Sequence, residues 1–414
     1  TTEIYTLSLH DALPIYHRGF TCILSLKRTM VTGFTAYKRR PLLMKSIIYL
    51  GMDVHTTNYT LCCYTLEDDR MCHLQQIAPD YRLILKYMDQ VRRLYNNDVE
   101  FLCGYEAGCL GYSLYHQLTA HQVRCVILAP TTMGAVLGIR KVKTDKRDAM
   151  LIAKCLAFHT YHPVHIPTPE EEQVKEFIRM RDDHKLALKR IKQQISAFCL
   201  RHGFHYTATK SKWTQAHWKW LKSLKPDGLH QETLNEYLLT CSSLCDKLER
   251  LDRRIEELAA QEPFQERVRQ LTCLVGVKTH TALSIIVEVG DFNRFPTAGK
   301  FASFLGLTPG EASSSDKQNR FGITKAGNTH VRRLLVEAAQ SYARGQTGRK
   351  SKDLKARQAG NKEQVIAYAD KGSERLRRRF RQLLYKGKQH NVIKTAIARE
   401  LSCFIWGMMT DRIA

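Results

Sequence analysis

The sequence predicts three successive regions: an α/β domain at residues 44–160, a helical, coiled-coil region at 161–262, and an α-rich domain at 263–414. Three observations predict this order. Apolar, β-branched runs alternate with amphipathic patterns in the first region. An apolar seam with alternating spacings of three and four residues follows, and helical patterns rich in basic residues dominate the rest of the chain.

The α/β domain begins with two strand patterns. SIIYLGMDVH (46–55) and NYTLCCYTLED (58–68) are apolar and β-branched. A helix is expected at 78–97, with an apolar face of four side chains: Leu83, Leu85, Met88 and Val91. A strand, a helix, a strand and a helix are then predicted, in this order: 98–106, 111–121, 123–130 and 144–158. The last helix has Thr144 as its expected N-cap, and the whole order predicts a mixed sheet.

The middle region carries a strict apolar seam, which predicts a long helix that packs against another helix. Its positions are Leu234, Tyr237, Cys241, Leu244, Leu248, Leu251, Ile255 and Leu258. The partner helix is open: it is either the helix around 174–198 of the same chain, or a second copy of the chain in a dimeric coiled coil.

The α-rich domain contains two segments that could contact nucleic acid. LTCLVGVKTHTALSIIVEVGDF (271–292) predicts a helix–hairpin–helix, in which Gly276 would let backbone N–H groups approach a DNA phosphate. Lys278 stands where a second glycine is usual, so a purely structural turn is also open. The segment 372–401 is a strongly basic helical stretch, and its Arg377, Arg378 and Arg379 are predicted to contact a nucleic-acid backbone.

The charge of the chain points to a polyanionic partner. The 414 residues include 64 Lys and Arg against 40 Asp and Glu, a formal net charge of +24. No uninterrupted apolar run is long enough for a transmembrane helix, which argues against a membrane protein. Nucleic acid is therefore the expected partner.

The thirteen cysteines follow no disulfide or metal-binding framework, because no CxxC pair occurs. An odd number without a framework indicates reduced thiols, as expected in a cytoplasm. Residues 1–43 are expected to be a non-native or disordered leader. The stretch YTLSLHDALPI (5–15) resembles a translated sequencing adapter, and a strand pattern begins directly after Met44.

Four carboxylates of the α/β domain could converge on one point. KTDKRDA (143–149) holds Asp145 and Asp148 three positions apart, on one face of the predicted helix. A salt-bridge lattice with the neighbouring bases would be the simplest explanation of this pair. However, Asp53 interrupts the first apolar strand, and Glu106 ends a later strand before a glycine-marked turn. Together the four acids predict a Mg²⁺ site, because Mg²⁺ prefers oxygen ligands at sites of phosphate transfer.

The motifs that carry the four acids, and a second segment in the α-rich domain, resemble those of a known family. YLGMDVH (49–55), GYEAG (104–108) and KTDKRDAMLIA (143–153) resemble the DEDD domain of insertion-sequence-110 family transposases, which is similar to the RuvC-like branch of the ribonuclease H fold. The segment 301–339, FASFLGLTPGEASSSDKQNRFGITKAGNTHVRRLLVEAA, resembles the transposase domain of the same family. The resemblance extends over nearly all of the chain from Met44.

The resemblance implies a DNA transposase that cuts and rejoins DNA through a covalent 5′-phosphoserine intermediate. The family's nucleophile lies a few residues after GLTP and maps best onto Ser314, while Ser313 and Ser315 remain open. A serine needs activation by a base or a metal, and Lys325, Arg332 and Arg333 are candidates to hold the phosphate. The resemblance also implies a guide RNA encoded by the element, and a homo-oligomer, such as a tetramer, in which acids and serine come from different subunits.

Two other functions remain open at this point. A RuvC-like, structure-selective nuclease would use water as its nucleophile and would have no need of the serine domain. A nucleic-acid-binding remnant of a dead element would have a decayed site, against which the complete set of four acids argues.

Overall fold

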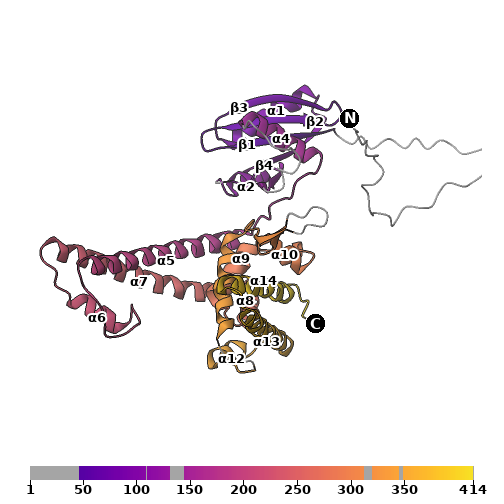
Figure 1. The fold of residues 1–414 in the computed structure, drawn as a ribbon. Coiled ribbons are helices and arrows are strands. Elements are labelled where there is room, and N and C mark those ends of the chain that lie inside the picture. Colours follow the sequence, from indigo (N-terminus) through magenta and orange to yellow (C-terminus); the bar gives the residue numbers. More distant parts are fainter. Residues whose placement is uncertain (1–45, 109, 131–143, 312–318, 345–347, 414) are drawn as a thin grey trace, which may run out of the picture. The chain divides into compact units, whose positions relative to one another are not determined.

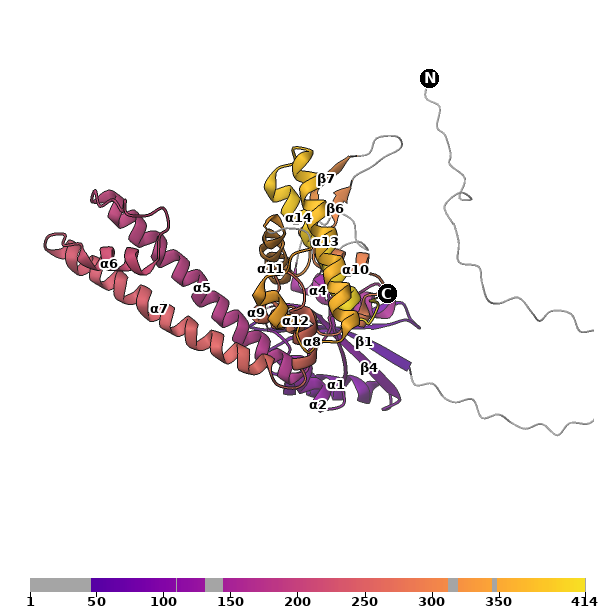
Figure 2. The same ribbon diagram turned by 90° about the horizontal axis from the view of Figure 1, so that it is seen from below.

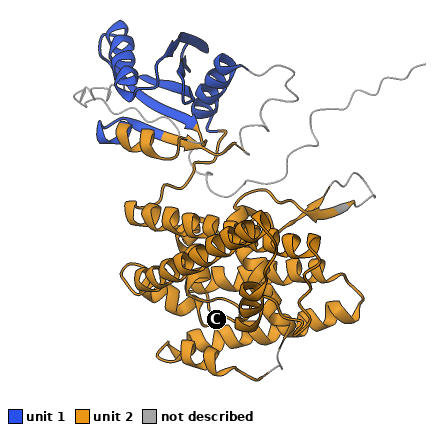
Figure 3. Ribbon diagram, turned by 90° about the vertical axis from the view of Figure 1, so that its left-hand side faces the viewer, with its two compact units in different colours: residues 1–105, 118–125, 141–159 blue, residues 106–117, 126–140, 160–414 orange. Residues whose placement is uncertain are grey.

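A computed structural model describes residues 46–108, 110–130, 144–311, 319–344 and 348–413. The predicted leader at 1–43 lies outside these residues. The chain divides into two compact units (Figure 3): residues 1–105, 118–125 and 141–159 belong to unit 1, and residues 106–117, 126–140 and 160–414 belong to unit 2. Each unit is described by itself.

The N-terminal part of the chain forms a five-stranded sheet in the order β3-β2-β1-β4-β5. Its strands are β1 (Ser46–Val54), β2 (Tyr59–Thr65), β3 (Arg70–Ile77), β4 (Val99–Glu106) and β5 (Arg124–Leu128). The β1–β2 and β2–β3 pairs are antiparallel, whereas β1 and β4 are parallel. The accompanying helices are α1 (Tyr81–Leu94), α2 (Ser113–Ala120) and α4 (Asp145–Ala157). The predicted mixed α/β sheet is confirmed.

The core of this sheet is apolar on both sides of β1, the central strand. Ile48, Leu50 and Met52 are fully buried, and every residue of β2 is buried as well. The buried face of α1 consists of Ile84, Tyr87, Met88 and Val91. The predicted face was therefore wrong at Leu83 and Leu85, which are only partly buried. The observed set has the i, i+3, i+4, i+7 spacing of a single helix face, which the predicted set lacks.

Two long helices in unit 2, α5 (Pro169–Arg201) and α7 (Leu229–Ala259), pack side by side and form a hairpin that carries α6 (Gln215–Ser223). Figures 1 and 2 show α6 at the end of the hairpin that lies away from α8 and α9. Side chains of all three helices, including Ile195, Leu221 and Leu234, form a small apolar core there. All eight seam positions are buried or partly buried. The partner helix within the same chain is thus α5; a dimeric coiled coil stays an untested prediction.

The rest of unit 2 is a helical body with a two-stranded sheet. Its elements are α8 (Gln265–Leu271), α9 (Thr279–Val289), the 3₁₀ turn Phe292–Arg294, α10 (Ala298–Phe304), β6 (Pro309–Glu311), β7 (Arg320–Ile323), α11 (Thr329–Ala339), the 3₁₀ turn Gln340–Ala343, α12 (Lys352–Gln358), α13 (Glu363–Tyr385) and α14 (His390–Met409). The buried helix α9 lies at its centre, and the base of the hairpin packs against it. No helix among these residues or the rest of the described chain is both long and apolar enough to span a membrane.

The structure shows the backbone of the two segments that were predicted to contact nucleic acid. Gly276 adopts a positive φ of 82°, and a Cβ atom there would lie 2.4 Å from the carbonyl oxygen of Ala338. This glycine therefore allows a close approach within the protein, and the helix–hairpin–helix reading stays a prediction. The basic stretch 372–401 spans two helices, α13 and α14, which are separated by a turn at Gly387.

A buried aspartate joins the hairpin to the helical body of unit 2. Asp182 on α5 forms an ion pair with Arg333 of α11, and its Oδ1 lies 3.2 Å from Nε2 of His280 on α9. Arg181 lies 3.1 Å from the same oxygen and also binds Asp252 of α7 through two hydrogen bonds. Burial alone would raise the pKa of Asp182, but these hydrogen bonds and charges outweigh it and hold the pKa well below its ordinary value.

Replacing Asp182 with alanine should lower the free energy of unfolding by about 3–5 kcal/mol, because the buried Arg181 would lose one of its two carboxylate partners and Arg333 would lose its buried one. Chemical denaturation measures this loss. The neighbouring Asp183 is exposed, so Asp183→Ala is the matched control and should have little effect. Because the folded pKa of Asp182 is lowered, its stabilisation is complete above the ordinary value of 3.8 and is lost as the pH falls towards the folded pKa. Equal stability of the two variants would contradict a structural role for this network.

Candidate active site

The candidate site lies at the carboxyl end of β1. Asp53 is the penultimate residue of this strand, and its side chain is 14% exposed. The five residues before it, 48–52, are buried, and β1 pairs with β2 and β4, so the sheet fixes the position of the Asp53 backbone. An acid at this place is costly to bury unless a cation or a hydrogen-bond donor meets it.

The helix α4 reaches the site because β1 contains a glycine. A Cβ atom at Gly51 would lie 2.1 Å from the carbonyl oxygen of Ala149 and 2.4 Å from the backbone nitrogen of Ala153. The backbone of α4 therefore lies directly against the strand, in a space that any other residue would fill. This close packing brings the first turn of α4 to the end of β1 that carries Asp53.

The first turn of α4 holds two more of the predicted metal ligands. The Thr144 side chain accepts a hydrogen bond from the backbone N–H of Arg147 at 3.4 Å, which confirms the predicted N-cap. Asp145 and Asp148 both lie in this turn and are partly buried. The positive end of the helix dipole favours negative charge at this position.

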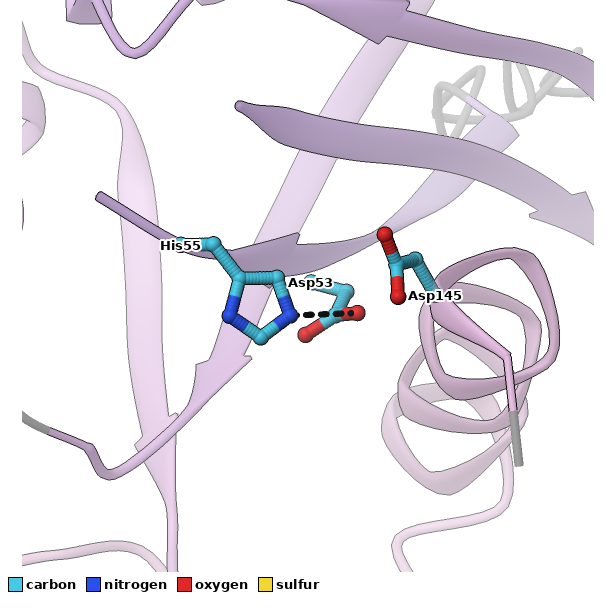
Figure 4. Close-up of side chains that lie close together, drawn as sticks. All are labelled: Asp53, His55 and Asp145. Carbon is cyan, nitrogen blue, oxygen red and sulfur yellow. Dashed lines mark ion pairs between the residues drawn. The ribbon is translucent and has the colours of Figure 1, made fainter. Parts of the chain in front are cut away.

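Three side chains meet closely enough to share a metal ion. One ligand atom each of Asp53, His55 and Asp145 lies within 4.8 Å of the other two. Figure 4 shows the imidazole of His55 and the carboxylate of Asp145 on either side of the Asp53 carboxylate. The Nε2 atom of His55 lies 3.3 Å from Oδ2 of Asp53. That oxygen is buried and has no hydrogen-bond partner among the described residues.

The electrostatics of Asp53 reflect crowding by other acids. Burial raises its pKa above the ordinary value of 3.8, and the charge of His55 opposes this shift. The negative charges of Asp148 and Asp145 raise the pKa further. A bound cation would remove this repulsion, and it could share the buried Asp53 oxygen with His55. The donor set thus fits a divalent cation.

The sequence reasoning missed His55. The alternation of side chains along a strand could have predicted it, because residues two apart project from the same face and His55 lies two residues after Asp53. Its imidazole is suited to transition metals such as Zn²⁺, Fe²⁺ or Ni²⁺ more than to Mg²⁺, which prefers an all-oxygen set. The side chain of His55 is 52% exposed, so it can also turn away and leave the carboxylates to the ion.

The remaining acids lie at defined places in the sheet and helix. Asp148 lies one turn from Asp145, and its charge acts on Asp53. Glu106 is the last residue of β4 and directly follows Tyr105, the register partner of Met52. Asp53 in turn directly follows Met52. The group of described residues with metal-ligand spacing includes neither Glu106 nor Asp148.

The three candidate serines, Ser313, Ser314 and Ser315, lie outside the described residues, but the segments on either side of them are held together. Pro309 of β6 pairs with Ile323 of β7. The backbone N–H of Lys325 donates to the carbonyl oxygen of Gly306 at 3.1 Å. The base of the connection that carries the serines is therefore closed by backbone hydrogen bonds.

The predicted phosphate-binding residues after the serines differ in their contacts. Lys325 is exposed. Arg332 donates to the carbonyl oxygen of Leu305 at 2.8 Å, and Arg333 pairs with Glu337 as well as with Asp182. Both arginines thus have partners within the protein, while Lys325 projects from the loop that follows β7.

The predicted basic triplet on α13 also has mixed surroundings. Arg377 is partly buried and donates to the carbonyl oxygen of Arg349 at 3.2 Å. Arg379 lies 3.5 Å from a carboxylate oxygen of Glu400 on α14, and Arg378 is exposed. Contact of this triplet with nucleic acid stays a prediction.

Comparison with known proteins identifies the family. A family model described as "Transposase IS116/IS110/IS902 family" matches residues 268–356, and a second model for a DEDD transposase of the IS110 type matches residues 50–204. The transposase for insertion sequence element IS1533 of Leptospira borgpetersenii is 33% identical over 350 residues, which cover 84% of this chain and 99% of the relative. The chain belongs to the IS110 family of transposases.

Other relatives of this transposase agree. The putative transposase y4qE of Sinorhizobium fredii is 34% identical over 308 residues, which cover 74% of this chain and 75% of the relative. The pilin gene-inverting protein of Moraxella lacunata is 23% identical over 299 residues, which cover 70% and 81%. The match to the DEDD model includes Asp53, Glu106, Asp145 and Asp148, so the candidate site lies within the transposase's DEDD domain.

Proposed function

We propose that this IS110-family transposase cuts and rejoins DNA through a serine that becomes covalently linked to a DNA 5′ end, with a divalent cation held by the DEDD acids. The approach of Asp53 and Asp145 within metal-ligand spacing carries this proposal. Glu106 and Asp148 are proposed to complete the set, and Mg²⁺ is the proposed ion because three or four carboxylates are oxygen ligands.

The ion would supply Lewis-acid polarisation of the scissile phosphate and offset the negative charge that develops there. Asp53 and Asp145 would hold it, and the rigid strand and helix beneath them would fix its position. Asp53 must be deprotonated for this task. Burial and the charges of Asp148 and Asp145 raise its pKa, and a bound cation would favour the ionised form.

Ser314 is the proposed nucleophile. Its hydroxyl oxygen forms a bond to phosphorus while the bond from phosphorus to the 3′ oxygen breaks. The serine proton passes to a base, and the leaving oxygen takes up a proton as a 3′-hydroxyl. The new ester conserves the phosphodiester bond, so the reverse attack by another 3′-hydroxyl joins strands without an external energy source. Lys325, Arg332 and Arg333 follow the serines and are proposed to neutralise the phosphate.

A guide RNA and a homo-oligomer complete the proposal. A net charge of +24 supports polyanionic partners, and a guide RNA would be one besides the DNA. The name of the Moraxella relatives describes inversion of a gene, which is a rearrangement of DNA and agrees with a recombinase. In this homo-oligomer, the acids and the serine of one active site would come from different subunits.

The test is a search for the covalent intermediate. The purified chain is incubated with end-labelled DNA that carries the element's junction, an RNA transcribed from its flanks, and Mg²⁺. A denaturing gel should show DNA that migrates with the protein, and this adduct should disappear when the metal is chelated. Cleaved DNA with free ends and no adduct would instead assign the chain to water-using nucleases of the RuvC-like type.

A further inference from the structure

A groove of about 1110 Å³ runs along α5 in unit 2. It is lined by one face of α5, by Trp213 in the segment before α6, and by the start of α11. The face of α5 presents Lys185, Lys189 and Lys192. At about 1.5 Å of rise per residue, these lysines follow one another at roughly 6 Å and 4.5 Å along the helix.

These three lysines have no carboxylate partner in the part of the chain that the structure describes. None of them forms a salt bridge with another residue that the structure describes. Like charges at such spacings on a helix repel each other. Two of the groove's acids, Asp182 and Glu337, are already paired with Arg333, and the third, Asp183, is exposed. An anion along the lysine row would remove the repulsion.

The positive charge continues beyond the groove. Residues 184–226, which include the second half of α5 and all of α6, contain ten Lys and Arg and no Asp or Glu. These residues reach the end of the hairpin that lies away from α8 and α9 (Figure 1). An acid-free stretch of this length suits a partner with many regularly spaced negative charges, and a phosphodiester backbone is such a partner.

Trp213 adds a second recognition element to the groove. Its ring is partly buried, and the Lys192 ammonium lies 5.1 Å from the ring centroid. His217 and Trp218 contact the ring edge-on, with centroids at 5.2 Å and 6.2 Å, so the indole is fixed in place. A fixed aromatic ring beside a row of cations is the combination by which proteins bind single-stranded nucleic acid, because bases stack on the ring while cations follow the phosphates.

We propose that this groove binds a single-stranded segment of nucleic acid, with the three lysines on consecutive phosphates and Trp213 stacked on a base. A duplex would use the lysines alone, since its bases are already stacked on each other. Single-stranded RNA and DNA share this chemistry. The groove contains neither the proposed metal ligands nor the serine. It does include Arg333, one of the residues proposed to neutralise the phosphate, but the variants below leave Arg333 unchanged. The test therefore concerns binding and is separate from the test of strand cleavage.

The test measures binding of the full chain to labelled oligonucleotides by fluorescence anisotropy over a range of salt concentrations. Single-stranded RNA, single-stranded DNA and a duplex are compared. The triple variant Lys185→Gln, Lys189→Gln, Lys192→Gln should lower the slope of log affinity against log salt by about 2, since each contact with a single strand contributes about 0.7. Whichever single strand shows this change is the ligand.

The matched control is Lys247→Gln, Arg250→Gln, Arg253→Gln, which removes three positive charges from α7 of the same hairpin. Its slope should stay near that of the unmodified chain. Equal slopes for the two triple variants would overturn the proposal, because they would show an effect of net charge alone. A change confined to the duplex would overturn it as well.

Two further measurements test the role of Trp213. Trp213→Leu should weaken single-strand binding about tenfold or more without changing the salt slope, because stacking releases no counterions. In the unmodified chain, an oligonucleotide containing 5-iodouridine should crosslink to the peptide that contains Trp213 on irradiation. Crosslinks that map only elsewhere would overturn the proposal, even if a variant failed to fold.

Discussion

Replacing Asp53 with asparagine should reduce DNA cleavage about a thousandfold or more. Asparagine keeps the size of the side chain but removes the anionic oxygen that meets Asp145 and His55. A bound cation contributes several kcal/mol to charge stabilisation at a phosphate, and each 1.36 kcal/mol is a factor of ten in rate. The fold should persist, because the raised pKa of Asp53 shows that the ionised form is disfavoured where it lies.

Three measurements separate this effect from misfolding. Mn²⁺ binding, followed by electron paramagnetic resonance, should weaken in Asp53→Asn, and thermal unfolding should be unchanged or shifted upwards. In the unmodified chain, metal affinity should rise as the pH is raised through the pKa of Asp53, since only the carboxylate binds the ion. Asp98 is an exposed acid of the same unit, so Asp98→Asn is the control and should retain cleavage. Full activity of Asp53→Asn would contradict a metal-binding role and would show that the acids only form salt bridges with neighbouring basic residues.

Replacing Ser314 with alanine should remove both the covalent adduct and strand cleavage while DNA binding remains. The acids alone would then have no nucleophile to act with. The measurement is the denaturing gel described for the unmodified chain, followed by peptide mapping of the adducted residue.

Ser313→Ala and Ser315→Ala are the matched controls, and each should still form the adduct. An adduct that maps to Ser313 or Ser315 would keep the mechanism and change only the residue. Cleavage that persists in Ser314→Ala would contradict the serine mechanism.

Much of the fold could be predicted from local patterns. Strand β1 was visible as an apolar, β-branched run, and the N-cap at Thr144 from its place before an apolar helix. The face of α1 could not be assigned correctly, because Tyr81–Leu94 carries apolar side chains at several phases, and only packing selects Ile84 and Tyr87. The heptad-like seam of α7 predicted a partner helix but could not name it, since the pattern is the same for α5 of one chain and for a second copy.

The acids of the candidate site could be predicted from the sequence, but the side chains around them could not. Asp53 and Asp145 stood out because they interrupt apolar or basic runs. His55 did not, since an exposed histidine after a strand has no distinctive pattern. The contacts of Asp182 and Arg181 could not be predicted either, because together they join α5, α7, α9 and α11, which are far apart in the sequence. Such contacts depend on tertiary packing, which the spacing of residues along the sequence does not reveal.

The close contact between Gly51 and α4 has a genetic consequence. Every amino acid other than glycine adds a Cβ atom, and here that atom would meet the backbone of Ala149 and Ala153 rather than a flexible side chain. Any missense change of this codon would thus force α4 away from β1 and separate Asp145 from Asp53. A copy of the element could lose its activity in this way while it still encodes all four acids. The presence of the four acids is therefore not enough to recognise active copies of the element in a genome. Gly51 must also be present.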